Sequence, residues 1–241
     1  MKSIRKFWNS FLAGAFVSVF CLHSSCLANL SISSVKDLEG PLKGVEIVRL
    51  LTPTSGHERK SLKKHFKKTC NFYVKTFSKK YTEFMDSLNV SSIDELEDGL
   101  REDCKMDARD LGNQQFAERF YFFEAREKKT GRILGLAAFK EKLPGVLYLS
   151  DLAATHYREP NRRGIGKQLF GAIFDLVQNV KSIELIVLPQ NTNAIAAYRG
   201  WGFVDDPSVT GDSNLKGPYQ GMKLDEAGVL DLKERLNSSS P

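Results

Sequence analysis

Residues 161–167 have the residue types and spacing that best suit a chemical site in this chain. They read Asn-Arg-Arg-Gly-Ile-Gly-Lys and lie between an apolar run at residues 145–154 and a helical pattern at residues 168–177. A strand, a glycine-containing turn and a helix N-terminus together form an anion site, because unpaired backbone N–H groups and the helix dipole point towards the ligand. The sequence therefore predicts that this turn binds an anion such as a phosphate.

The residue types in the turn fit a diphosphate. Gly164 and Gly166 have no side chain that would keep the ligand away from the backbone N–H groups. Positive charge around the same point comes from Arg162, Arg163 and Lys167. A basic loop that joins a strand to a helix and binds nothing is the alternative, because short glycine motifs match often.

The composition is typical of one folded domain of generous size. Of the 241 residues, 41% are hydrophobic and 27% are charged, as in soluble folded proteins. Beyond the N-terminus no apolar stretch is long enough to span a bilayer, which excludes a membrane protein with several spans. The four histidines are scattered, and no Cys/His cluster has the spacing of metal ligands, so we expect no metal site.

The first 28 residues are typical of a signal peptide. Three positive residues, Lys2, Arg5 and Lys6, precede an apolar run at residues 11–22, and small residues follow at the usual distance for cleavage. We expect an exported protein, periplasmic or secreted. An uncleaved N-terminal membrane anchor, with the domain on either side, is the alternative. Without residues 1–28 the net charge falls from +6 to about +3, which is too small to indicate nucleic acid as a partner.

Hydrophobic periodicity predicts strands and helices in alternation after this segment. We expect strands at residues 44–51, 118–126, 132–139, 145–154, 182–188, 203–204 and 219–224. We expect helices at residues 57–88, from Ser91 or Ser92 to Cys104, and at residues 168–177, 191–199 and 226–236.

The two helices predicted after the first strand carry two further signals. Cys70 and Cys104 lie on their apolar stripes, where either a disulfide or a pair of buried thiols fits. The opposite face of the first helix is rich in lysine, which suits a membrane surface, nucleic acid or simply solvent.

A second motif, in residues 191–203, gives the chain a family resemblance. Its pattern is N-x-x-A-x-x-x-Y-x-x-x-G-F, and it follows the strand at 182–188. Together with the unit at 145–177, it resembles the GNAT superfamily of acyl-CoA-dependent N-acetyltransferases over residues 44–224. The resemblance implies an α/β (α+β) fold, with a mixed, twisted central sheet that splays between its fourth and fifth strands and is flanked by helices.

The resemblance also implies domain bounds. The acetyltransferase domain would cover residues 44–228, with an enlarged helical segment at 57–110 after the first strand and a C-terminal tail at 229–241. A bulge near the end of the strand at 145–154 would open the splay for the thioester.

Cofactor-binding roles follow from the resemblance at the matching positions. The coenzyme A pyrophosphate would be bound by Arg162, Arg163, Gly164, Ile165, Gly166 and Lys167. The pantetheine amides would meet the backbone of Leu152, Ala153 and Ala154. Asn191 would steady the cofactor arm. The chain departs from the family at Asn161, where Gln or Arg is usual, and Arg162 and Arg163 can supply the missing charge.

The catalytic residues that we expect are an acid and a base. The resemblance places Tyr198 near the departing sulfur as general acid, whereas an aromatic residue packed in the core is the alternative. A base is needed because an amine is protonated at neutral pH. Asp151 in the central strand is the first candidate and Glu184 in the next strand is the second, and either could instead be an ordinary polar strand residue.

The expected activity is transfer of an acetyl group from acetyl-CoA to a primary amine of a small molecule or protein, by direct attack in a ternary complex. A non-catalytic coenzyme A-binding protein, or an exported effector or scaffold protein on the same fold, is the alternative. The helices at 57–104 and the loop at 205–217 would form the acceptor pocket. No nucleic acid is expected, a membrane contact would run only through the N-terminus, and a homodimer is left open.

Overall fold

The fold is built on a single eight-stranded sheet. The computed structural model describes residues 32–82, 85, 88, 90–112, 119–154, 164–211 and 218–238. The strands are β1 (Ile32–Asp37), β2 (Val45–Leu50), β3 (Phe120–Glu127), β4 (Ile133–Leu143), β5 (Val146–Ala154), β6 (Ser182–Val187), β7 (Val204–Asp205) and β8 (Gln220–Leu224). Their order is β1-β2-β3-β4-β5-β6-β8-β7. Only β5 and β6 run parallel; the other neighbours are antiparallel.

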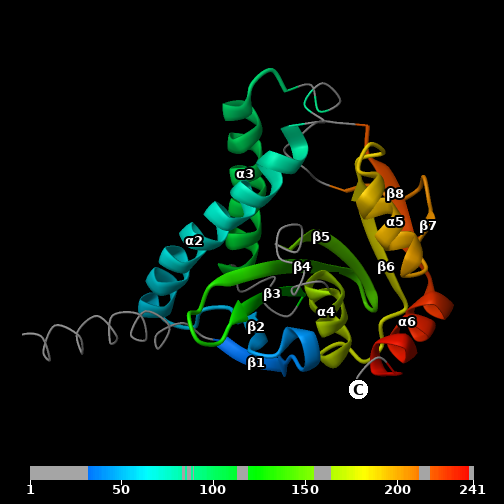
Figure 1. The fold of residues 1–241 in the computed structure, drawn as a ribbon, viewed down its shortest axis with the longest axis horizontal. Coiled ribbons are helices and arrows are strands. Elements are labelled where there is room, and N and C mark those ends of the chain that lie inside the picture. Colours follow the sequence, from blue (N-terminus) through cyan, green and yellow to red (C-terminus); the bar gives the residue numbers. More distant parts are fainter. Residues whose placement is uncertain are drawn as a thin grey trace, which may run out of the picture.

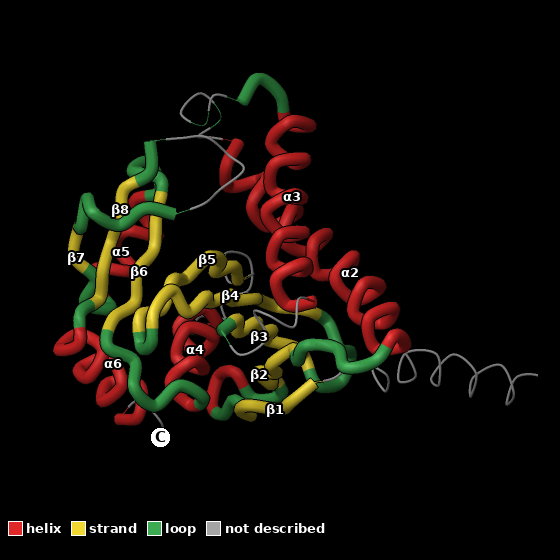
Figure 2. Tube along the Cα trace, turned by 180° about the vertical axis from the view of Figure 1, so that it is seen from behind, coloured by secondary structure: helices red, strands yellow, loops and turns green. Residues whose placement is uncertain are grey.

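Helices cover both faces of this sheet (Figure 1). The α-helices are α2 (Gly56–Tyr81), α3 (Ile93–Gly112), α4 (Ile165–Gly171), α5 (Thr192–Gly200) and α6 (Glu226–Ser238). Two short 3-10 helices are η1 (Gly40–Leu42) and η4 (Ala172–Asp175). The long helices α2 and α3 lie together on one face of β2–β5, and α4 lies on the other, as the view from behind also shows (Figure 2).

Alternate residues of β3 and β4 belong to two different hydrophobic clusters, one on each face of the sheet. Phe123 and Phe139 join the cluster around α4, whereas Phe122 and Ala138 join the cluster around α2 and α3. Successive strand residues point to opposite faces, so two buried faces require nearly continuous apolar strands. The runs at residues 120–125 and 133–139 meet that requirement.

Capping residues fix the starts of α2 and α3. The Ser55 hydroxyl accepts a hydrogen bond from the Glu58 N–H, and the Glu58 carboxylate accepts one from the Ser55 N–H. Ser92 accepts in the same way from the Glu95 N–H, and the Glu95 carboxylate accepts from Ser91. Such boxes satisfy the donors that a helix leaves unpaired at its N-terminus. At α3, Ser92 is thus the capping residue of the two expected, and the Glu95 carboxylate bonds back to Ser91, one residue before the cap.

A disulfide joins α2 to α3. The Sγ atoms of Cys70 and Cys104 are bonded, and the Cα atoms are 5.6 Å apart, within the usual range for a disulfide. Both residues are buried between the two helices. Of the two arrangements that the sequence leaves open, the structure has the disulfide.

The expected α/β fold is confirmed, with some differences in its elements. β1 is an additional edge strand that the sequence analysis does not predict, because only Ile32 and Val35 are apolar in it. α2 ends at Tyr81, although the predicted pattern runs to Leu88. The predicted helix at 168–177 is split, since α4 tightens into η4 after Gly171.

The C-terminal segment differs from the expected tail. The predicted helix at 226–236 is present as α6, and its Val229, Leu232 and Leu236 are buried in the α4-side cluster. Residues 229–238 therefore pack as part of the domain. The expected signal peptide at residues 1–28 lies outside the described residues, and no described helix is both long and apolar enough to cross a membrane.

Candidate functional site

The candidate site is a cavity between β5 and β6. The two strands pair only from Val146 with Ser182 to Tyr148 with Glu184. Beyond this point β5 continues along β4 to Ala154, while β6 continues along β8. The part of β5 from Leu149 to Ala154 is therefore not paired to β6. This separation is consistent with the splay expected between the fourth and fifth predicted strands.

The cavity has a volume of about 110 Å³ and is lined by residues of α2, α3, β5, β6 and α5. Because a water molecule needs roughly 10–15 Å³ measured in this way, there is room for several waters or for a small reacting group. Its lining includes Tyr73 and Phe77 of α2, Leu100, Asp103 and Met106 of α3, Asp151 and Leu152 of β5, Leu185 and Val187 of β6, and Asn191, Ala194, Tyr198 and Tyr219.

A bulge in β5 decides which way Asp151 points. Phe139 pairs with Leu149 but Ala138 pairs with Asp151, so Ser150 is an extra residue in β5. A bulge of this kind moves the following side chains to the opposite face. Asp151 therefore lies on the same face as Ala138, towards α2 and the cavity, instead of the α4 face that Leu149 occupies.

Tyr198 reaches the same cavity from α5. Its ring packs against Trp201 and Phe203, with centroids 5.6 and 5.7 Å away, so it is also part of the core. Its hydroxyl is enclosed, although the residue as a whole is only half-buried. Burial raises the pKa of the Tyr198 phenol well above its ordinary value, and the negative charge of Asp151 raises it further. The phenol therefore keeps its proton at neutral pH.

Tyr73 is a cavity residue that sequence reasoning missed. Its hydroxyl donates a hydrogen bond to Asp151 Oδ1 across the space between α2 and β5. In the sequence Tyr73 is one member of the apolar stripe of α2, and a tyrosine at such a position usually packs in the core. Only the neighbouring carboxylate, which belongs to a strand 78 residues further along the chain, distinguishes it.

Glu184, the second predicted base, is not brought to the cavity. Its carboxylate lies 3.1 Å from the Lys142 Nζ and 3.9 Å from the Lys223 Nζ, where it is 16% exposed. The residues of β6 that line the cavity are those after Glu184. Of the two predicted carboxylates, the structure therefore brings only Asp151 together with Tyr198.

The predicted acceptor elements are only partly present at the cavity. Residues of α2 and α3 line it. From the predicted loop at 205–217, Asp205 instead pairs with Arg199 at 2.8 Å, and Asp206 accepts hydrogen bonds from Ser208. Residues 212–217 lie outside the described part of the chain.

The turn before α4 has the backbone that an anion site needs. Gly164 is the N-cap residue and has φ of +95°, in the left-handed region that favours glycine. The N–H groups of Ile165, Gly166 and Lys167 begin the helix and so lack partners within it. A Cβ atom at Gly166 would lie 4.0 Å from the Cβ of Ala154, which places this turn beside the end of β5. Arg162 and Arg163 lie outside the described residues.

Asn191 begins α5 at the other side of the gap. It is buried, and its side-chain oxygen accepts a hydrogen bond of 3.3 Å from the Ala194 N–H. The cap thus uses the carboxamide oxygen, and the amide nitrogen is the group that can donate to a ligand. Among the described residues, no three or more His, Cys, Asp or Glu side chains gather as a metal ion would need.

Comparison with known proteins connects these features with one family. The profile of the acetyltransferase (GNAT) family matches residues 83–203, just over half of the chain. The PaiA N-acetyltransferase from Thermoplasma acidophilum, solved with coenzyme A, is 17% identical with a TM-score of 0.52, over 74% of this chain and 97% of that one. A GNAT-family acetyltransferase from Staphylococcus aureus Mu50 is 14% identical with a TM-score of 0.48, over 75% and 99%. None of the curated proteins compared matches this chain.

Structural similarity at such low sequence identity shows only that the fold is shared. The match to the family profile shows that the sequence is related as well. The chain therefore belongs to the GNAT family of acetyltransferases, in which acetyl-CoA is the co-substrate.

Proposed function

We propose that this protein transfers the acetyl group of acetyl-CoA to a primary amine by direct attack in the cavity between β5 and β6. The observation that carries the proposal is that Asp151 and Tyr198, one from each side of the gap, line one cavity and interact electrostatically. A carboxylate that accepts protons and a phenol that retains its proton are the base and the acid that acyl transfer to an amine requires.

The base is needed because the acceptor arrives protonated. An amine with a pKa near about 10.4 costs roughly 4–5 kcal/mol to deprotonate at pH 7, at about 1.36 kcal/mol for each pKa unit. Asp151 is half-buried and faces the cavity, so its carboxylate can take this proton directly or through one water. The amine nitrogen then forms its bond to the acyl carbon while the proton remains on the Asp151 side.

The acid is needed when the carbon–sulfur bond breaks. Tyr198 would give its phenolic proton to the departing sulfur, which leaves as a thiol, and the phenolate would then regain a proton from solvent. Backbone N–H groups on the free edge of β5 can donate to the oxygen on which negative charge develops. The products are the amide and coenzyme A. Starting from the ammonium form, the nitrogen loses two protons, the first to Asp151 and the second after attack, while sulfur gains one, so the net reaction releases one proton to solvent.

Acetyl-CoA supplies the activated acyl group, and the residues present fit it. Gly164, Ile165, Gly166 and Lys167 offer backbone N–H groups and one charge for the pyrophosphate. The unpaired edge of Leu152, Ala153 and Ala154 suits the amides of the pantetheine arm. The Asn191 amide nitrogen can donate to the same arm from α5.

A panel of primary amines, from small diamines to lysine peptides, tests this proposal with thiol release from acetyl-CoA as the readout. We expect release with at least one amine, and a Tyr198→Phe variant that binds acetyl-CoA normally in calorimetry but has kcat lower by about 100-fold. A Tyr121→Phe variant, altered on β3 away from the cavity, is the matched control. Binding of acetyl-CoA without turnover by any amine would favour the non-catalytic alternative.

We also propose that the protein is exported or tethered at a membrane. The Cys70–Cys104 disulfide supports export, because disulfides persist mainly in oxidising compartments. Since acetyl-CoA is a cytoplasmic metabolite, turnover would then take place after delivery into another cell, or on the cytoplasmic side of a tether. Mass spectrometry of the protein from fractionated cells tests this. An intact Met1 and two free thiols in the soluble cytoplasmic fraction would contradict it.

A further inference from the structure

The face of α2 that packs on the sheet carries a line of polar side chains. His65, Thr69 and Tyr73 follow one another at intervals of four residues and so share one face of the helix. Thr69 is fully buried and Tyr73 is 5% exposed. Buried polar groups of this kind are stable only with hydrogen-bond partners, and each of these three has a carboxylate as its partner.

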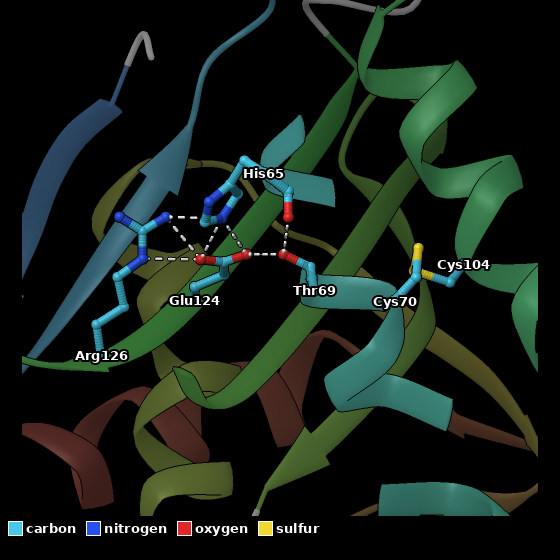
Figure 3. A network of polar contacts seen from close by, with 6 residues as sticks. All are labelled: His65, Thr69, Cys70, Cys104, Glu124 and Arg126. Atoms are coloured by element: carbon cyan, nitrogen blue, oxygen red, sulfur yellow. Dashed lines mark hydrogen bonds and ion pairs between the residues drawn. A yellow bond between two sulfur atoms is a disulfide. The ribbon is translucent and has the colours of Figure 1, made fainter. Parts of the chain in front are cut away.

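The first two side chains bind Glu124 of β3 (Figure 3). The Thr69 hydroxyl donates to Glu124 Oε1 at 2.7 Å, and the His65 Nε2 lies 2.9 and 3.0 Å from the two carboxylate oxygens. Arg126 donates from Nε to Glu124 Oε2 at 2.8 Å. Glu124 is fully buried, so this network fixes the position of α2 along the sheet.

The third side chain reaches the site itself. One turn beyond Thr69, the Tyr73 hydroxyl donates to Asp151 Oδ1 on β5. Between them on the helix, Cys70 is bonded to Cys104 of α3, and Figure 3 shows this disulfide beside Thr69. In the two turns before Tyr73, α2 is therefore fixed to β3 by polar contacts and to α3 by a covalent bond.

We propose that Tyr73 is a positioning residue for acyl transfer, which orients the Asp151 carboxylate by a hydrogen bond to Oδ1. This inference rests on the proposed function, in which Asp151 takes the proton of the amine. With Oδ1 bound by the phenol, we expect Oδ2 to be the oxygen that takes the proton of the amine. The hydrogen bond restricts rotation of the carboxylate about its side-chain torsions, so that it meets the amine in one orientation.

The test is Tyr73→Phe, which removes the hydroxyl and keeps the ring that packs against Phe77 at 4.6 Å. We expect kcat to fall by about 10- to 100-fold, the effect of losing a hydrogen bond to a charged group. The KM for acetyl-CoA should stay within about twofold, because Tyr73 does not lie on the predicted cofactor side. Expressing kcat per acetyl-CoA-binding site, measured by calorimetry, removes any contribution from unfolded protein.

A double-mutant cycle with Asp151→Asn separates this role from a general effect on α2. If Tyr73 acts through Asp151, Tyr73→Phe should change the residual kcat of Asp151→Asn by less than about threefold. An equal loss in both backgrounds, or an unchanged kcat in Tyr73→Phe alone, would overturn the inference. Tyr121→Phe should leave kcat and KM unchanged.

The same assays distinguish an error in the proposed function from an error in the role of Tyr73. If the wild-type protein releases no thiol with any amine, acyl transfer itself is absent. If the wild type is active, Asp151→Asn is impaired and Tyr73→Phe is not, then only the role of Tyr73 is wrong.

Discussion

The two faces of the sheet are stabilised by different chemistry. On the α4 face, Phe170 packs against the rings of Phe139, Phe174, Trp201 and Phe203. On the α2 face, a buried Glu124–Arg126 pair and a disulfide supplement the apolar contacts. The first face supports the elements expected to bind acetyl-CoA, and the second supports those expected to receive the acceptor. The cofactor side therefore depends on packing, whereas the acceptor side also depends on charge and on oxidation state.

The largest effect is expected for the packing on the α4 face. Phe170→Ala should lower the free energy of unfolding by about 3–5 kcal/mol, because it removes a buried ring and leaves a cavity. Urea unfolding measures this loss. Leu230→Ala, at a position that is 58% exposed, is the control and should change the free energy by less than about 1 kcal/mol. A similar small change for Phe170→Ala would show that this face is not maintained by packing.

Glu124→Gln should affect the α2 face almost as strongly. It leaves Arg126 buried without its ionised partner, which costs about 3–5 kcal/mol at pH 7. Glu102→Gln, at an exposed ion pair with Lys105, is the matched control and should leave the free energy of unfolding almost unchanged.

The Glu124 contribution should also depend on pH. Burial alone would raise the pKa of Glu124, but His65 and Arg126 outweigh it and lower the pKa from 4.5 to about 2. A lowered pKa in the folded state gives stability that is present above pH 4.5 and is lost as the pH falls towards 2. The stability gap between the wild type and Glu124→Gln should therefore shrink by about 3 kcal/mol over that window. A gap that does not change with pH would contradict the lowered pKa.

Removing the disulfide should weaken the acceptor side selectively. A Cys70→Ala/Cys104→Ala variant loses a crosslink between residues 34 apart, and we expect it to unfold with about 2–4 kcal/mol less free energy. Because α2 and α3 line the cavity, the KM for the amine should rise while the KM for acetyl-CoA stays the same. Steady-state kinetics on the oxidised, reduced and substituted forms measure this. An equal rise in the KM for the amine and the KM for acetyl-CoA would contradict a disulfide effect confined to the acceptor side.

The smallest effect is expected at the cofactor turn. Gly164→Ala puts a side chain on a residue with φ of +95°, which costs about 1–2 kcal/mol in the left-handed region. The new Cβ atom would meet only Leu42 Cδ1, at 3.9 Å, so the cost comes from the backbone and not from a clash. Gly200→Ala, where nothing lies within 4 Å and φ is ordinary, should not destabilise. An equal change in melting temperature for Gly164→Ala and Gly200→Ala would contradict a cost that comes from the left-handed backbone at Gly164.

The sequence predicts the cofactor side better than the acceptor side for a physical reason. Contacts near Gly164 and Asn191 are local, since a turn and an N-cap each form within a few residues and leave a readable motif. The contacts of Tyr73 and Glu124 join residues more than fifty positions apart, and no short pattern records them.

Strand alternation in the sequence likewise cannot predict the face of the sheet on which Asp151 lies. It depends on the extra residue Ser150, whose hydroxyl donates to the Ala138 carbonyl at 3.2 Å. The family resemblance predicts a bulge near this position, but periodicity alone would have placed Asp151 with Leu149 on the opposite face.

The kinetics of Asp151→Asn, measured with an amine that the wild type acetylates, test the central claim most directly. If acyl transfer takes place between β5 and β6 with Asp151 as base, kcat should fall by at least about 100-fold while acetyl-CoA binding in calorimetry is unchanged. A variant that binds acetyl-CoA and keeps kcat within about threefold of the wild-type value would contradict the account, because a general base contributes far more than that.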